Sequence, residues 1–191
     1  MLVSGADGRC EMKAWHFGTK DGLLRYGDDR KAEVGVTHKV DCKPILCTHG
    51  LHASKRLIDA LDYAPSEILW RVELGGEIVH GDDKCVATER TYLHRIDITD
   101  ILWKFSRLCA LDVIHLWDAP DVVVQFLKTG DESLRASAWA SARESARESA
   151  SASAWASARE SAWASARESQ ISAKNKRLTR MVNYAISKGA K

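Results

Sequence analysis

The sequence predicts an α+β fold: a small mixed or antiparallel sheet with packed helices, followed by a long Ala/Ser-rich helical region. Residues 12–98 hold short alternating segments separated by Gly- and Asp-rich turns, which is typical of strands. Residues 99–191 show helical spacing instead, and a chain of 191 residues can bury one good core. We therefore expect a head over residues 1–98, a helical extension packed on it over 99–130, and a repeat helix over 131–191.

The strands are predicted where apolar and polar residues alternate between turn residues. They are expected at residues 12–19, 34–40, 45–46, 69–74, 85–89 and 92–98. Gly75 and Gly76 are expected to form a hairpin-like turn from the strand at 69–74 into residues 77–80, and Gly81-Asp82-Asp83 a further turn before the strand at 85–89.

A candidate site lies in the stretch from Cys47 to Leu74. Gly50 predicts a tight turn, and Ser54 is placed to cap a short helix that ends before Pro65. His52 would then lie on a short polar loop just outside the helix N-terminus. Loops of this kind, held between rigid elements, often carry binding groups.

Three further helices are expected after the head. Thr99 begins the first, Pro120 lies in the first turn of the second, which ends at Gly130, and Asp131 caps the third. The last turns, with Leu178 on the apolar side, are expected to form an amphipathic helix end. The tryptophans expected in the core are Trp70, Trp103 and Trp117.

Residues 137–168 repeat units such as Ser-Ala-Trp-Ala and Ser-Ala-Arg-Glu, without Gly or Pro, which favours helix. A repeat of four residues advances about 40° on a helix, so Trp139, Trp155 and Trp163 fall on different faces. The tract could fold back near residues 149–154, pack along the head or self-associate. Large aromatic side chains on such a helix need a partner surface, so a homo-oligomer through residues 131–191 is the simplest expectation.

Charge and composition limit the function classes. Residues 131–191 carry 11 Lys/Arg and 6 Asp/Glu, but no aromatic residues interleave with the basic segment 174–180, so nucleic-acid binding is not expected. No apolar run is long enough to span a bilayer, and the five cysteines form no regular framework. We expect a cytoplasmic protein of a bacterial host, with no membrane partner.

Several motifs resemble an uncharacterised domain that is common in phage and prophage genomes. The motifs are Gly35-Val-Thr37, Leu46-Cys-Thr-His-Gly-Leu-His-Ala53, Asp59-Ala-Leu-Asp-Tyr63, Arg71-Val-Glu73 and Asp83-Lys-Cys-Val-Ala87, followed by the Ala-rich repeats. This resemblance covers most of the chain and implies a phage-type accessory protein, but it implies no activity.

A second resemblance is to the ADP-ribosyltransferase and poly(ADP-ribose) polymerase fold. It rests on Trp15-His-Phe-Gly-Thr19, Gly50-Leu-His-Ala-Ser54, Ala60-Leu-Asp-Tyr63 and Leu69-Trp-Arg-Val-Glu-Leu-Gly75, which follow that family's order and spacing. In the family, the first His holds the adenosine ribose, a Tyr stacks on nicotinamide and a later Glu orients the other ribose. The resemblance implies a nucleotide pocket in the head. Its candidate ligand-binding residues are His16, Thr19, Gly50, His52, Ser54, Tyr63, Glu77 and Glu89.

The chain also departs from that family. Phe17 is inserted after His16, His52 replaces the stacking Tyr, and neither candidate Glu lies in a recognisable motif. A pocket that lacks the acid would bind a nucleotide without transferring its ADP-ribose group, so we favour a binding protein over an enzyme. The expected function is binding of an NAD-derived or other nucleotide, to sequester or process a host-defence signal; the alternative is a structural or partner-binding protein.

Two other chemistries stay open for the same stretch. Cys42, Cys47, His49 and His52 are zinc-type ligands, but their spacing fits no common structural zinc site, so no metal is expected. Cys47 with a neighbouring His could act as a nucleophile if its thiolate were stabilised. No resident cofactor is expected.

Overall fold

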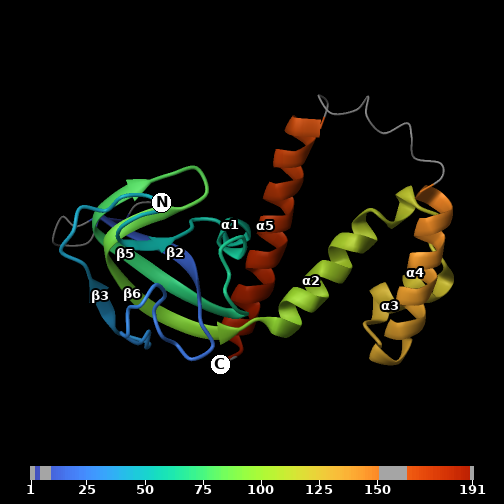
Figure 1. Ribbon diagram of the computed structural model, residues 1–191, viewed down its shortest axis with the longest axis horizontal. Coiled ribbons are helices and arrows are strands. Elements are labelled where there is room, and N and C mark those ends of the chain that lie inside the picture. Colours follow the sequence, from blue (N-terminus) through green and yellow to red (C-terminus); the bar gives the residue numbers. More distant parts are fainter. Residues whose placement is uncertain (1–2, 5–9, 151–162, 190–191) are drawn as a thin grey trace. The chain divides into compact units, whose positions relative to one another are not determined.

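The structure is a computed structural model that describes residues 3–4, 10–150 and 163–189. The chain divides into two compact units, shown in Figure 1. The first, which we call the head, comprises Met1–Thr99 together with Asn175–Lys191. The second, which we call the helical unit, comprises Asp100–Lys174.

The head is built on an antiparallel sheet of six strands. Its order is β1-β2-β5-β6-β3, and β4 also pairs with β6. The strands are β1 (Val3–Ser4), β2 (Cys10–Gly18), β3 (Thr37–Lys39), β4 (Leu51–Ala53), β5 (Ile68–His80) and β6 (Cys85–Asp97). All of these pairs are antiparallel, which confirms the predicted α+β class.

The predicted turn at Gly75-Gly76 is wrong. Strand β5 continues to His80, and the register against β6 shifts between Gly75 and Ile78, where Gly76 has a φ of 69°. The two glycines form a β-bulge, which uses the same backbone freedom as a turn but does not reverse the chain. The reversal follows His80, where the Gly81 N–H donates to the Lys84 carbonyl at 2.8 Å.

The predicted helix cap at Ser54 is also wrong. Helix α1 (Leu57–Leu61) has Arg56 at its N-cap position, without a side-chain cap. Ser54 is buried, and its backbone N–H and carbonyl pair with those of Trp15 at 2.9 and 2.8 Å. His52 therefore lies on strand β4, opposite Val86, and not on a loop.

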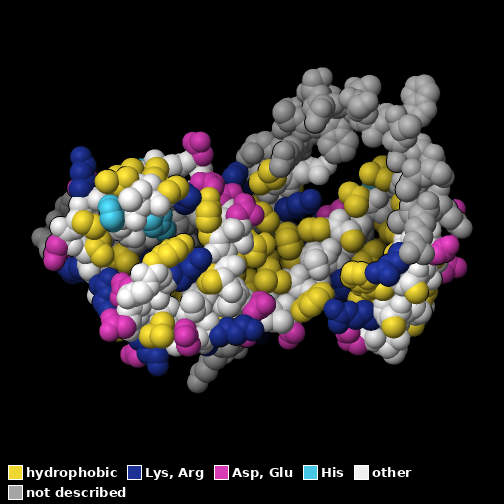
Figure 2. All heavy atoms as spheres, in the orientation of Figure 1, with side chains coloured by type: hydrophobic (Ala, Val, Ile, Leu, Met, Phe, Trp, Pro, Cys, Tyr) yellow, Lys and Arg dark blue, Asp and Glu magenta, His cyan; other side chains and the backbone are white. Residues whose placement is uncertain are grey.

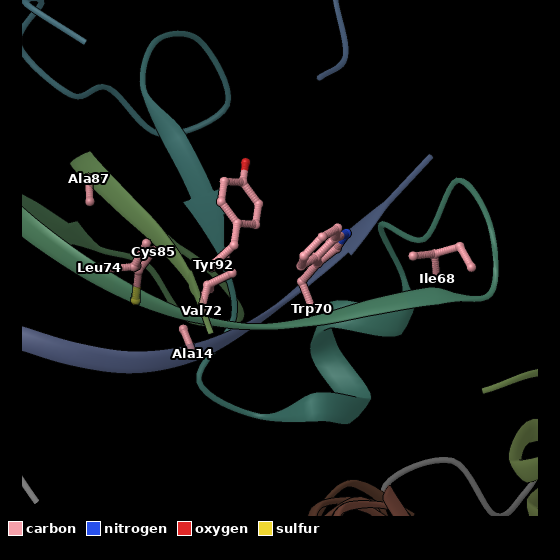
Figure 3. Close-up of a cluster of buried hydrophobic side chains, with 9 residues drawn as sticks. Ala14, Ile68, Trp70, Val72, Leu74, Cys85, Ala87 and Tyr92 are labelled. Carbon is pink, nitrogen blue, oxygen red and sulfur yellow. The ribbon is translucent and has the colours of Figure 1, made fainter. Parts of the chain in front are cut away.

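The sheet carries the hydrophobic core of the head. Figure 3 shows the buried cluster, in which the rings of Trp70 and Tyr92 project on the same side of the strands. Their centroids lie 5.1 Å apart in an edge-to-face arrangement. Leu24 and Ala32, from the segment between β2 and β3, pack against this cluster and cover part of it.

Helix α5 (Trp163–Ser187) contributes its last turns to the head. Leu178 and Val182 are fully buried, and the Asn175 side chain accepts a hydrogen bond from the Ile58 N–H in α1 at 3.2 Å. The predicted amphipathic helix end is confirmed.

The helical unit begins with α2 (Thr99–Asp112), which starts at the head boundary. It continues with η1 (Ile114–Leu116), α3 (Asp121–Thr129), η2 (Glu132–Leu134) and α4 (Arg135–Ala150). Gly130 ends α3 with a φ of 70°, and the Asp131 carboxylate accepts from the Ser133 N–H at 2.9 Å, so both predicted signals are confirmed. The packing of residues 99–130 on the head stays a prediction.

The two tryptophans of the helical unit that were predicted for the core, Trp103 and Trp117, are not buried; Trp117 is half-buried. Trp103 is 55% exposed and therefore not a core residue, although the Arg135 guanidinium lies 4.8 Å from its ring centroid. Trp139 is 64% exposed. Trp155, the side chain of Trp163 and the predicted fold-back region from residue 151 onward lie outside the described parts of the chain. No helix in residues 10–150 or 163–189 is long and apolar enough to cross a membrane.

Candidate functional site

One face of the sheet gathers polar side chains from three strands. His16 on β2 lies opposite Trp70, Tyr92 on β6 lies opposite Val72, and Arg90 lies opposite His38. Because opposed and alternate strand residues share a face, these polar side chains point to the same side of the sheet. Histidine side chains also reach the surface of the head in the view of Figure 2.

Arg90 is the centre of this group, and its side chain is almost fully buried. Its Nε and Nη2 donate to the Tyr92 hydroxyl at 3.1 and 2.6 Å, and its Nη1 donates to the His52 carbonyl at 2.7 Å. Burial lowers its pKa, but a guanidinium stays charged in proteins. Among the described side chains, no carboxylate forms an ion pair with Arg90.

His16 does not supply the missing negative charge. Its Nδ1 lies 3.3 Å from Nη1 of Arg90, which is a donor, so Nδ1 acts as the acceptor. Burial, followed by the charge of Arg90, holds the pKa of His16 well below 6.5. The ring is therefore neutral at pH 7, and the hydrogen-bond partners of the buried cation are all neutral, although the Asp28 carboxylate acts on it through space.

Two further buried polar atoms near Tyr92 have no hydrogen-bond partner. They are Nε1 of Trp70 and Nδ1 of His38, and both residues are more than nine-tenths buried. Both rings contact Tyr92 edge-on, with centroid distances of 5.1 and 5.3 Å. Buried polar groups are normally paired, so these two atoms are exceptions among the described residues.

His52 lies between Arg90 and a second polar group at the surface, which contains Cys47, Tyr63, Asp83 and Lys84. Its ring Nε2 accepts from the Cys47 N–H at 3.1 Å, and burial lowers its pKa. The pKa of Lys84 is raised first by a hydrogen bond to the Cys47 thiol and then by one to the Tyr63 hydroxyl. The Lys84 ammonium lies 3.2 Å from that hydroxyl, which also bonds to Asp83 and has a raised pKa because of that carboxylate.

The candidate acids lie elsewhere. Glu77 and Glu89 line an open groove together with Lys39, whose ammonium pairs with Glu89 at 2.8 Å. Glu89 and Arg90 are neighbours in one strand, so their side chains point to opposite faces of the sheet. Glu89 therefore does not share a pocket with His16.

The other predicted residues have structural roles. The Thr19 hydroxyl donates to the Leu23 carbonyl at 2.6 Å, and Ser54 pairs with Trp15 through its backbone. Gly50 has a φ of 114°, and a Cβ there would lie 2.5 Å from a methyl group of Val86. These three positions shape the site without presenting a group to a ligand.

Sequence reasoning missed Arg90, Tyr92 and Lys84. Arg90 lies in the gap between the predicted strands at 85–89 and 92–98, which the structure joins as the single strand β6. Continuous alternation through that gap would have placed Arg90 on the same face as Tyr92.

Residues 29–104 match a family model described as a domain of unknown function, DUF7666. The match includes His52, Tyr63 and Arg90, and it leaves His16 outside. No curated protein and no solved structure matches the chain. In the part of the chain that the structure describes, no group of three His, Cys, Asp or Glu side chains could hold a metal ion.

Proposed function

We propose that the head binds an NAD-derived or other nucleotide, with its phosphates held near Arg90, His52 and Lys84. The observation that carries this proposal is the buried Arg90 guanidinium, whose hydrogen-bond partners are all neutral. Buried charges are costly unless an opposite charge accompanies them, and guanidinium groups bind phosphate well. A phosphate would supply a directly bound negative charge, which no described carboxylate provides.

The proposal is for binding without group transfer. The resemblance to ADP-ribosyltransferases calls for an acid beside the ligand ribose, but Glu89 points to the other face of the sheet from Arg90. In a phage-type accessory protein, such a site would serve to sequester or process a nucleotide signal of host defence.

Isothermal titration calorimetry with NAD, ADP-ribose and a cyclic nucleotide tests the proposal on the full chain. We expect at least one ligand to bind, and Arg90→Met to weaken it by about tenfold or more, since a charge-assisted hydrogen bond contributes about 1.5–3 kcal/mol. Arg71→Met is the matched control, because Arg71 is a half-buried arginine on the opposite face, over the Trp15 ring. No binding by the folded wild type would overturn the proposal.

A second candidate function is assembly through the repeat helix. Trp139 is 64% exposed on α4, and tryptophan is enriched where protein surfaces bind each other. Light scattering on the full chain should show an oligomer that Trp139→Ser weakens, while Ser106→Ala, at an exposed position of α2, leaves it unchanged. A wild-type monomer would exclude this candidate and leave the nucleotide proposal standing.

A further inference from the structure

The outward face of α5 within the head carries a basic stripe. The opposite, apolar side of the helix is buried through Leu178 and Val182. Lys176, Arg180 and Tyr184 follow one another at intervals of four residues, so they form one stripe along the helix.

This stripe borders a shallow groove that has further hydrogen-bonding side chains. Asn175, Thr179 and Asn183 line the groove beside the stripe. Amide, hydroxyl, ammonium and guanidinium groups are the side chains that most often contact nucleic-acid phosphates and sugars.

The charge of this segment is uniform. Residues 174–191 hold six Lys or Arg and no Asp or Glu. Within the described part of the chain, neither Lys176 nor Arg180 forms an ion pair. Two cations without carboxylate partners on one exposed helix face attract a polyanion.

Tyr184 supplies the aromatic group that the sequence pattern did not show. It is 65% exposed and lies one turn after Arg180, just beyond the basic segment 174–180. An exposed aromatic ring beside cations is the arrangement that stacks an unpaired base.

The same geometry argues against a membrane surface as the partner. A helix that lies on a bilayer inserts its apolar face, and in α5 that face is occupied by the packing of Leu178 and Val182 in the head. Only the polar, basic face remains available.

We propose that the outward face of residues 175–187 binds single-stranded nucleic acid, with Lys176 and Arg180 on its phosphates and Tyr184 stacked on a base. This site is separate from Arg90 and does not depend on the proposed nucleotide site.

The test is fluorescence anisotropy of a labelled single strand of about 20 thymidines, titrated with the full-length protein at several salt concentrations. Wild type should bind at low salt and weaken as salt rises. Lys176→Ala with Arg180→Ala should lower the salt slope by about 1.4, since each phosphate contact on a single strand contributes about 0.7. Tyr184→Ala should weaken binding by about tenfold.

The matched control is Lys104→Ala with Lys128→Ala, which removes two exposed cations from α2 and α3. Circular dichroism verifies that each variant is folded. The proposal is overturned if the wild type does not bind the strand at low salt, or if the α5 variant binds as the control does. Binding to phosphatidylserine vesicles without binding to the strand overturns it as well.

Discussion

Removing the Tyr92 hydroxyl tests the arrangement around Arg90 most simply. Tyr92→Phe keeps the buried ring but takes away the acceptor of two guanidinium donors, at 2.6 and 3.1 Å. A hydrogen bond to a charged group contributes about 1.5–3 kcal/mol, and the two donors share one oxygen, so we expect a loss of about 2–4 kcal/mol. Urea denaturation followed by tryptophan fluorescence measures the free energy of unfolding.

A double-mutant cycle identifies the cause of that loss. In an Arg90→Met background, the charged donors are absent, so Tyr92→Phe should cost about 1 kcal/mol or less. Tyr26→Phe is the control, because Tyr26 is 92% exposed. The reasoning is contradicted if Tyr92→Phe costs less than about 1 kcal/mol in the wild type, or if it costs the same in the wild type and in Arg90→Met. In either case, the hydroxyl does not stabilise the buried Arg90 guanidinium.

Three further predictions concern stability of the full chain in urea. Gly50→Ala should lower the free energy of unfolding by about 2 kcal/mol or more, because at a φ of 114° the new Cβ would clash with Val86. Gly35→Ala is the control: its φ is 87°, but no atom lies within 4 Å of the new Cβ, so only the smaller backbone strain is expected. Equal losses at the two positions would contradict the close approach at Gly50. Burial keeps the pKa of His16 well below 6.5, so the unfolded chain takes up this proton first as the pH falls. The stability present above pH 6.5 should therefore be lost below it by up to about 1.4 kcal/mol per pH unit, and His16→Asn should flatten the profile; an unchanged profile would refute a neutral ring. Leu178→Ala should cost about 2–5 kcal/mol because the side chain is fully buried, against about 0.5 kcal/mol or less for exposed Lys176→Ala; similar losses would show that α5 does not belong to the head core.

The sheet was predictable where alternation was uninterrupted. The predicted strands at 12–19 and 69–74 correspond to β2 and the first half of β5. Prediction failed at Gly75-Gly76, because two glycines favour a bulge and a turn equally until the partner strand is known. The short helix also began later than predicted, since the backbone of Ser54 pairs with Trp15.

The site was predictable only in part. The motifs named His16 and His52, and in the structure both hydrogen-bond to Arg90; their role in binding stays a prediction. Arg90 was missed because the strand was predicted in two pieces, at 85–89 and 92–98, whereas β6 runs unbroken and puts Arg90 and Tyr92 on one face. Local pattern shows which residues can alternate, but pairing with β3 and β5 decides which of them are buried.

The effect of nucleotide on the stability of the full chain tests whether a phosphate binds at Arg90. The free energy of unfolding should rise with the logarithm of ADP-ribose concentration, by about 2.7 kcal/mol at one hundred times the dissociation constant. Uncharged adenosine should have much less effect, because it brings no phosphate to Arg90. If ADP-ribose, NAD and the cyclic nucleotide all leave the unfolding free energy unchanged, or adenosine raises it equally, no nucleotide phosphate binds at Arg90.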